Sequence, residues 1–144
     1  MSYILALERL RAVPTANNIS TVLNYAEDIL KGIAHMHEKR ILHRDIKPSN
    51  IMFKQGAKPM CKLIDFNLSK QLEIGEKSFT ADVGTDGFQA PEVIEVDPER
   101  GYDYKSDMYS FGLTVKELSE NCPKVSEKFL DSVEELIFFV SSRI

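Results

Sequence analysis

Carboxylate, ammonium and amide side chains lie close together in one short segment of this 144-residue sequence. Asp45, Lys47 and Asn50 fall within a single loop-like stretch, and Asp65 follows a little further along the chain. Carboxylate and amide oxygens suit Mg²⁺, and an ammonium group can neutralise a phosphoryl group during its transfer. A further carboxylate can accept the proton of an attacking hydroxyl. Brought together by the fold, these residue types are suited to phosphoryl transfer.

A predicted β-hairpin would bring these groups together. Two apolar runs, 51–53 and 61–64, flank a turn-rich segment that contains Gly56. Antiparallel pairing places the start of the first strand beside the end of the second. Asn50 directly precedes the first strand and Asp65 directly follows the second. We therefore expect these two side chains to meet at one end of the hairpin, beside the loop that carries the other two groups.

Three helices are predicted around this loop, over about 20–38, 105–119 and 126–140, because apolar residues recur there every three or four positions. The buried face expected for the first helix consists of Leu23, Ala26, Leu30, Ile33 and His37. The second aligns Met108, Phe111, Val115 and Leu118, and Tyr109 and Leu113 leave little of its circumference polar, so we expect it to be deeply buried. The third aligns Phe129, Val133, Leu136 and Val140. The segment 66–101 lacks periodicity, and irregular segments of that length tend to be functional.

Composition indicates one compact, soluble domain, with 43% hydrophobic and 28% charged residues. The net charge of −4 comes from interleaved acids and bases, which argues against nucleic acid as a partner. We see no secretory signal, and the apolar run 136–140 is far too short to span a bilayer. Cys61 and Cys122 lack metal-ligand spacing and are expected to be reduced thiols. We therefore predict an intracellular, cytoplasmic protein with no membrane partner.

Taken in order, the motifs resemble those of the eukaryotic-type protein kinase family. The catalytic loop of that family is similar to 43–50, and its metal-binding triplet is similar to 65–67, Asp-Phe-Asn. Gly84-Thr85 resembles the substrate-docking loop, 90–92 (Ala-Pro-Glu) the end of the activation segment, and 106–112 the start of the central helix. A lysine followed by proline in the catalytic loop resembles the serine/threonine branch rather than the tyrosine branch.

The resemblance implies ATP and Mg²⁺ as ligands and assigns roles to the loop residues. Asp45 would be the catalytic base, and Lys47 would contact the γ-phosphate. Asn50 and Asp65 would hold the metal, and Thr85 would bridge the docking loop to the catalytic residues. The full set of residues implied to bind ATP and its metal is Lys47, Ser49, Asn50, Met52 and Asp65.

A second group of residues would support or regulate the site. By the same resemblance, Asp107 would brace the backbone of the catalytic loop, and His43 would be a packed, orienting residue. Arg44 would read a phosphorylated activation segment, for which Ser78 and Thr80 are the candidate acceptors. The remaining structural or regulatory positions are Phe66, in the metal triplet, and Glu92, which in the family pairs with an arginine much further along the chain.

The implied fold is mainly α with a short β-hairpin, equivalent to the lower, C-terminal lobe of a kinase domain without its β-rich upper lobe. The first glycine is Gly32, inside a predicted helix, so no Gly-rich phosphate loop precedes the catalytic loop. Residues 1–144 would form a partial kinase domain, in which 19–120 carry the catalytic motifs and 121–144 form a divergent C-terminal helix. Asn67 stands where the family has glycine, which bears on how easily that loop changes conformation.

Three functions are open at this point. The first is a serine/threonine kinase that transfers the ATP γ-phosphate to a protein substrate. The second is a non-catalytic, kinase-like binding module, and the third is a truncated gene product whose upper lobe is encoded upstream. A hydrolase built on His43, Asp45 and Asp65 is disfavoured because nothing supplies an activated water. If the run 136–140 is left uncovered, we expect self-association through that apolar surface.

Overall fold

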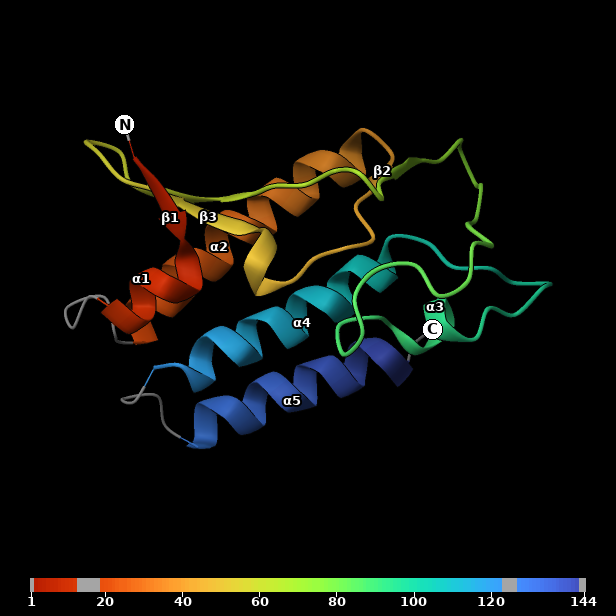
Figure 1. Ribbon diagram of the computed structural model, residues 1–144. Helices are drawn as coiled ribbons and strands as arrows, with labels where there is room; N and C mark the ends of the chain where they lie inside the picture. The colour runs from red at the N-terminus through yellow and green to blue at the C-terminus, as the bar shows by residue number, and fades with distance from the viewer. Residues whose placement is uncertain (1, 13–18, 123–126, 143–144) are drawn as a thin grey trace.

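The computed structural model describes residues 2–12, 19–122 and 127–142, the last seven of them as helical backbone alone (Figure 1). Its helices are α1 (Ala6–Ala12), α2 (Ile19–Glu38), α3 (Pro91–Ile94), α4 (Lys105–Glu120) and α5 (Glu127–Ser142), with a 3₁₀ turn, η2, at Pro48–Asn50. Figure 1 shows α4 and α5 running alongside each other, and α4 also packs against α2. The three predicted long helices are confirmed, while α3 was not predicted because four residues give too short a pattern.

Two small antiparallel sheets complete the fold. The first has the order β1-β3-β4, formed by Tyr3–Leu5, Ile51–Lys54 and Met60–Leu63. The β3–β4 pair is the predicted hairpin, with Ile51 opposite Leu63. β2 (Ile41–Leu42) pairs with β5 (Lys70–Gln71) to form the second sheet. The sequence did not predict β1, β2 or β5, because each is two or three residues long and has a partner far away in the chain.

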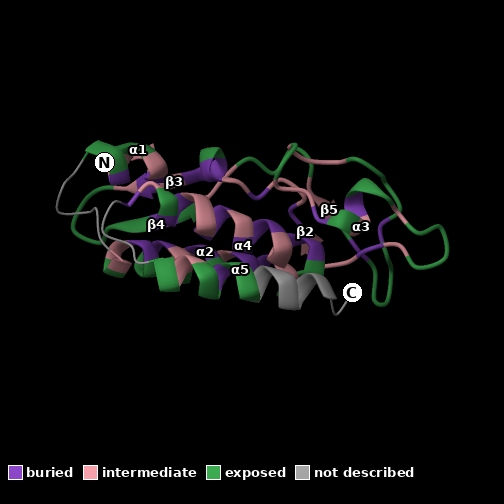
Figure 2. Cartoon of the chain, turned by 90° about the horizontal axis from the view of Figure 1, so that it is seen from below, coloured by how far each residue is buried: buried purple, intermediate pink, exposed green. Residues whose placement is uncertain are grey.

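The main core lies between α2, α4 and the first sheet, where the buried residues gather in Figure 2. α4 is buried on most sides, as its sequence predicted, and its polar residues Ser106, Asp107 and Thr114 are buried as well. A smaller second cluster joins β2, the activation segment and the turn before α4. Its members are Leu42, Leu72, Ala90, Val93 and Tyr102. The helix α4 therefore supports both the loop that carries the charged groups and the irregular segment 66–101 that faces this loop.

The predicted buried face of α2 is confirmed at Ile33 but is otherwise displaced by about one residue. Leu23 and Leu30 are 49% and 41% exposed. The buried side chains are Val22, Tyr25, Ile29, Ile33 and Met36. Two rows of apolar residues with the same spacing run along this helix. They differ by one position, which corresponds to a rotation of the buried face by about 100° about the helix axis. Tertiary contacts decide which row is buried. Asp28, on the side of α2 that faces the sheet, accepts the backbone N–H of Cys61 at 2.9 Å, which fixes the rotation of the helix.

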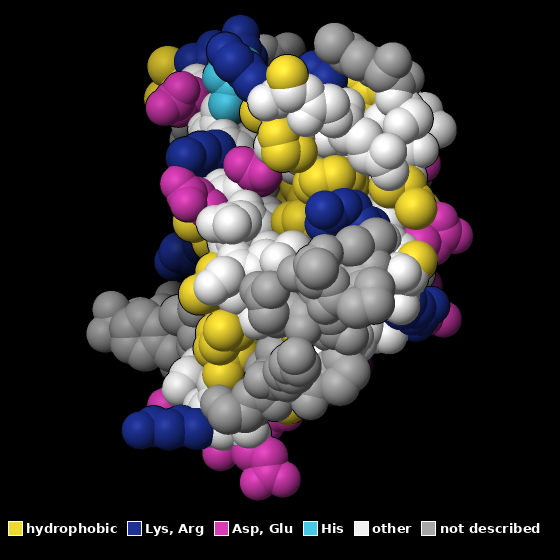
Figure 3. Space-filling view, turned by 90° about the vertical axis from the view of Figure 1, so that its left-hand side faces the viewer, with side chains coloured by type: hydrophobic (Ala, Val, Ile, Leu, Met, Phe, Trp, Pro, Cys, Tyr) yellow, Lys and Arg dark blue, Asp and Glu magenta, His cyan; other side chains and the backbone are white. Residues whose placement is uncertain are grey.

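The surface is mixed in character. On the face shown in Figure 3, hydrophobic side chains reach the surface between Lys, Arg, Asp and Glu side chains. Val133 of α5 is buried against the core, as predicted. The side chains of the apolar run 136–140, on which the expected self-association depends, lie outside the described residues. In the part of the chain that the structure describes, no helix is long and apolar enough to cross a membrane.

Candidate active site

A buried carboxylate on α4 holds the backbone of the loop that carries the charged groups. Asp107 is only 1% exposed, and its two oxygens accept the backbone N–H groups of His43 at 2.8 Å and Arg44 at 3.0 Å. The Nε2 atom of His37, from α2, lies 2.9 Å from the same carboxylate. A buried carboxylate is costly unless its oxygens are satisfied, so these contacts make one geometry of the loop strongly preferred.

His43 fixes the next part of the loop. Its ring is fully buried, and its Nδ1 accepts the N–H of Asp45 at 3.1 Å. The opposite nitrogen, Nε2, donates to the carbonyl oxygen of Ile64 at 3.1 Å, at the end of β4. One neutral tautomer satisfies both bonds. The histidine thus connects the loop to the hairpin, and the ring of Phe66 packs edge-on against it at 5.2 Å between centroids.

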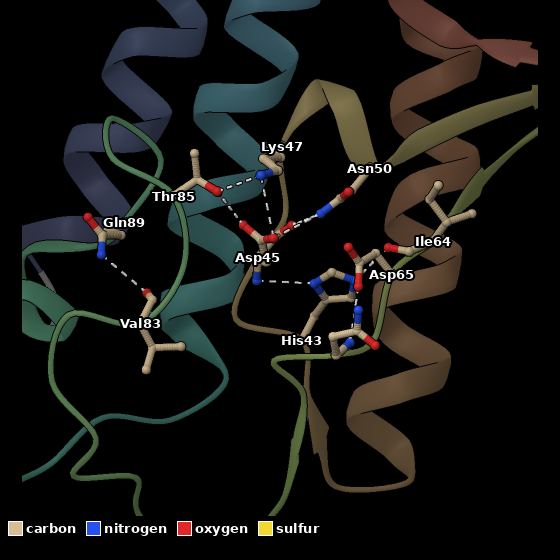
Figure 4. Close-up of polar contacts among 10 residues, drawn as sticks. His43, Asp45, Lys47, Asn50, Ile64, Asp65, Val83, Thr85 and Gln89 are labelled. Carbon is tan, nitrogen blue, oxygen red and sulfur yellow. Dashed lines mark hydrogen bonds and ion pairs between the residues drawn. The ribbon is translucent and has the colours of Figure 1, made fainter.

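Asp45, Lys47 and Thr85 form a triangle of polar contacts (Figure 4). The Lys47 ammonium donates to the Thr85 hydroxyl at 2.6 Å, and that hydroxyl donates to Asp45 Oδ1 at 2.6 Å. Lys47 Nζ lies 3.5 Å from the other Asp45 oxygen, in an ion pair that is mostly sheltered from solvent. Figure 4 shows Thr85 pointing from the activation segment toward the loop. Segments about forty residues apart therefore meet at a carboxylate and an ammonium.

Asn50 and Asp65 both lie at the predicted end of the hairpin, but no hydrogen bond joins their side chains. The amide nitrogen of Asn50 donates to the Asp45 carbonyl at 2.8 Å and to the Asp45 carboxylate at 3.1 Å. Its backbone carbonyl accepts the N–H of Ile64 at 2.9 Å, which closes the hairpin. These bonds do not use the amide oxygen of Asn50. Among the described residues, the exposed Asp65 carboxylate accepts one hydrogen bond, from the N–H of Asn67 at 3.2 Å.

The local backbone explains how Asp65 is presented. Asp65 itself has a φ of 62°, in the left-handed region, whereas Asn67 is not among the residues with positive φ. Asn67 therefore carries no backbone strain in this conformation, although the family has glycine there. Of the other residues implied to contact a nucleotide, Ser49 is exposed at η2, and Met52 is half-buried on the central strand of the first sheet.

The predicted regulatory residues differ in their surroundings. Arg44, with a φ of 68°, donates from Nε to the Leu68 carbonyl at 2.6 Å. Its Nη1 is buried and has no hydrogen-bond partner among the described residues. Ser78 is fully buried, whereas Thr80 is exposed and its carbonyl accepts the Tyr102 hydroxyl at 2.7 Å. Of the two candidate phosphorylation sites, only Thr80 is accessible in this conformation.

Glu92, at the start of α3, is a half-buried acid with one buried carboxyl oxygen. Its Oε1 makes no hydrogen bond among the described residues, and burial raises the pKa of its carboxyl group. It lines a pocket of about 440 Å³ together with Asp103 and Lys105. Arg143, the last arginine of the sequence, lies outside the described residues.

Two residues that shape the site were not predicted. The His37–Asp107 contact joins residues that are 70 positions apart, so no local pattern could indicate it. Gly84 has a φ of 112°, and a Cβ atom there would lie 2.6 Å from the Arg44 carbonyl oxygen. The motif predicted a bridging role for Thr85 and no separate role for Gly84. The glycine is what allows the activation segment to approach the catalytic loop closely.

A family model described as the protein kinase domain matches residues 7–139, which is most of the chain. The chain belongs to the protein kinase family. This confirms the resemblance that the motifs suggested, and the mainly helical fold with small antiparallel sheets is consistent with it.

Among individual kinases, the chain is similar to the human Nik-related protein kinase, with 42% identity over 98 residues. That match covers 67% of this chain and 6% of the human protein. Misshapen-like kinase 1 of Rattus norvegicus is 39% identical over 102 residues, covering 69% of this chain and 8% of the rat protein. The serine/threonine-protein kinase nekl-2 of Caenorhabditis elegans is 41% identical over 121 residues, covering 78% of this chain and 32% of nekl-2. The chain thus spans no more than about a third of these relatives.

Proposed function

We propose that this chain transfers the γ-phosphate of ATP to a serine or threonine hydroxyl of a protein substrate, as the lower lobe of a kinase domain. The observation that carries the proposal is the triangle of Asp45, Lys47 and Thr85. It holds a carboxylate and an ammonium side by side on a loop whose backbone is fixed by a buried acid. Phosphoryl transfer needs mainly positioning and charge stabilisation, and this loop supplies both.

In this proposal Asp45 orients the acceptor hydroxyl and accepts its proton. The ammonium group of Lys47, which lies beside Asp45, neutralises charge on the transferring phosphoryl group. Thr85 donates to Asp45 and accepts from Lys47, so the two groups keep their relative positions. Because Thr85 belongs to the activation segment, it also joins the position of that segment to the geometry of the two catalytic groups.

The residues at the hairpin end fit a Mg²⁺ ion that accompanies ATP. The amide oxygen of Asn50 and the exposed carboxylate of Asp65 are hard oxygen donors, and their other atoms already have hydrogen bonds that orient them. Mg²⁺ commonly takes one or two such protein ligands and completes its shell with water and phosphate oxygens. When bound, the ion would neutralise phosphate charge. Ser49 and Met52 are proposed to contact the nucleotide from η2 and β3.

An assay of phosphate transfer tests the proposal. The chain is incubated with Mg²⁺, γ-labelled ATP and a mixture of serine- and threonine-containing proteins, and incorporated label is counted. We expect Asp45→Asn to lower the rate by about 10²- to 10⁴-fold, because the hydroxyl loses its proton acceptor. Asp86→Asn is the matched control, since Asp86 is an exposed acid next to Thr85 and should leave the rate unchanged. Absence of transfer by the wild-type chain, or equal rates for wild type and Asp45→Asn, would refute the proposal.

A further inference from the structure

An open pocket lies where the outer edge of β4 meets α2, which packs against that strand (Figure 2). It has a volume of about 530 Å³ and shares no residue with the Asp45–Lys47–Thr85 triangle. Its apolar walls are formed by Met36, Met60, Leu63 and Phe66. The side chains of Met60 and Phe66 are 39% and 49% exposed. A pocket of this size, with mainly apolar walls and a few polar groups, is typical of a binding site.

A glycine inside α2 forms part of the wall, although nothing among the described residues requires a glycine there. Gly32 lies within the 20-residue helix, does not have a positive φ, and would bring an added Cβ atom within 4 Å of no other heavy atom. Glycine lowers the stability of a helix interior relative to alanine. Such a position is explained if the backbone of another chain approaches the helix closely at this point.

The backbone of β4 is open on the same side. Cys61 donates its N–H away from β3, to the Asp28 carboxylate at 2.9 Å. Because the backbone groups of an antiparallel strand point alternately to its two sides, the N–H and C=O of Leu63 are directed to the same outer edge. β4 is an outer strand in the order β1-β3-β4, so no described strand covers this edge. An extended peptide can add to such an edge as a further strand.

The charged groups around the pocket favour an acidic peptide. Lys62 and His35 are both exposed, and neither forms an ion pair among the described residues. Lys31 is already paired with an acid one turn earlier on α2, at 2.6 Å. The carboxylate in the lining, that of Asp28, is occupied by the backbone N–H that it accepts from β4. The ammonium group of Lys62 is therefore left for a carboxylate of the partner.

We propose that this pocket is a docking site for an extended segment of a partner protein, in which a large apolar residue lies close to a glutamate or aspartate. The backbone of the segment hydrogen bonds to Leu63 at the edge of β4 and passes close to Gly32. Its apolar side chain fills the space between the two methionines and Phe66, and its carboxylate pairs with Lys62. The docking site does not depend on the proposed function, because it shares no residue with the groups proposed to transfer phosphate.

Binding of designed peptides to the 144-residue chain tests this proposal. The probes are labelled peptides of about seven residues, built from serine and threonine, with leucine, isoleucine or phenylalanine at the centre and glutamate one or two residues away. Partner peptides carry serine in place of the apolar residue, or glutamine in place of glutamate. In fluorescence anisotropy at low salt, we expect at least one probe to lose about tenfold in affinity without its apolar residue and about threefold without its charge.

Variants of the chain locate the binding site. Gly32→Leu fills the pocket, and it should weaken binding at least tenfold without lowering the thermal unfolding midpoint, since leucine is the better helix former. Ala34→Leu is the matched control, because it adds the same side chain at an exposed position of α2 outside the pocket. Lys62→Gln should remove the preference for glutamate, whereas Lys58→Gln, in the hairpin turn, should keep it.

Strand addition has its own readout, because the N–H of Leu63 gains an acceptor when the peptide binds. Exchange of this amide, followed by NMR, should slow at least tenfold with saturating peptide, and unchanged exchange would exclude strand addition. The proposal is also overturned if no probe binds more tightly than its serine partner, or if Gly32→Leu binds as well as wild type. Self-association of the wild-type chain that Gly32→Leu abolishes, without peptide binding, would instead assign the pocket to a second copy of the chain.

Discussion

The catalytic loop, 43–50, and the activation segment, 66–92, meet at the Asp45–Thr85 contact but are held in place in different ways. Most of the loop is buried or half-buried, and a buried carboxylate and a buried histidine fix its backbone from below. Much of the activation segment is exposed, including Ile74 at 85% and Phe79 at 52%.

A few separated contacts hold the activation segment. Ser78 pairs with Tyr102 through two backbone hydrogen bonds of 2.8 and 2.9 Å. Asp82 donates its N–H to the Val93 carbonyl at 2.8 Å, and the Phe88 carbonyl accepts the Ser110 hydroxyl at 2.6 Å. Between these points the segment has little apolar burial. Regions of that kind open at low free energy, whereas the loop can move only if a buried polar network is broken.

The largest expected effect comes from removing the acid beneath the catalytic loop. Asp107→Ala leaves the His43 and Arg44 N–H groups and the His37 ring without their acceptor, so we expect a loss of about 3–5 kcal/mol in the free energy of unfolding. Urea denaturation followed by circular dichroism measures this. Glu120→Ala, on the same helix but exposed, should change stability by no more than about 0.5 kcal/mol. Similar losses for the two variants would mean that the network does not hold the loop.

A smaller effect is expected where the activation segment approaches the loop. At Gly84 a methyl group would lie 2.6 Å from the backbone oxygen of Arg44, whereas at Gly87, which also has positive φ, nothing lies within 4 Å. Gly84→Ala should therefore cost about 2–3 kcal/mol, and Gly87→Ala about 1 kcal/mol from backbone strain alone. Thermal unfolding of the two variants compares them directly. Equal costs would show that the close approach to Arg44 is not maintained in solution.

The smallest expected effect is a pH dependence of stability that arises in the activation segment. Burial raises the pKa of Glu92 above its ordinary value of 4.5, so the folded state holds this proton more tightly than the unfolded state. The associated stability is present below about pH 4.5 and is lost as pH rises through the folded-state pKa.

Glu92→Gln should therefore be as stable as wild type near pH 4 and increasingly more stable than wild type toward pH 7. Urea midpoints at several pH values test this, with the exposed neighbour Glu95→Gln as the control for loss of one charge. A difference between wild type and Glu92→Gln that stayed constant with pH would rule out the raised pKa as its cause.

The sequence predicted the catalytic loop and the elements around it better than the activation segment. α2, α4 and the hairpin follow from hydrophobic periodicity, and the loop between them follows from the ordered motifs. Periodicity could not choose between the two rows of apolar residues on α2, because the choice depends on contacts such as Asp28 with Cys61. The burial of Ser78 was also not predictable, since it results from a bridge to Tyr102, 24 positions further along the chain. Local patterns identify elements, whereas long-range pairing decides which of their faces and hydroxyls remain accessible.

Hydrogen exchange, measured by mass spectrometry on the 144-residue chain without nucleotide, tests most directly whether the catalytic loop is held more firmly than the activation segment. If the catalytic loop is formed in advance, peptides that cover 41–50 should exchange slowly, since the His43 and Arg44 amides donate to a buried carboxylate. Peptides that cover 73–77 and 83–87 should exchange within the shortest labelling time. Fast exchange in 41–50, at the rate of the activation segment, would contradict the account of a prebuilt catalytic loop.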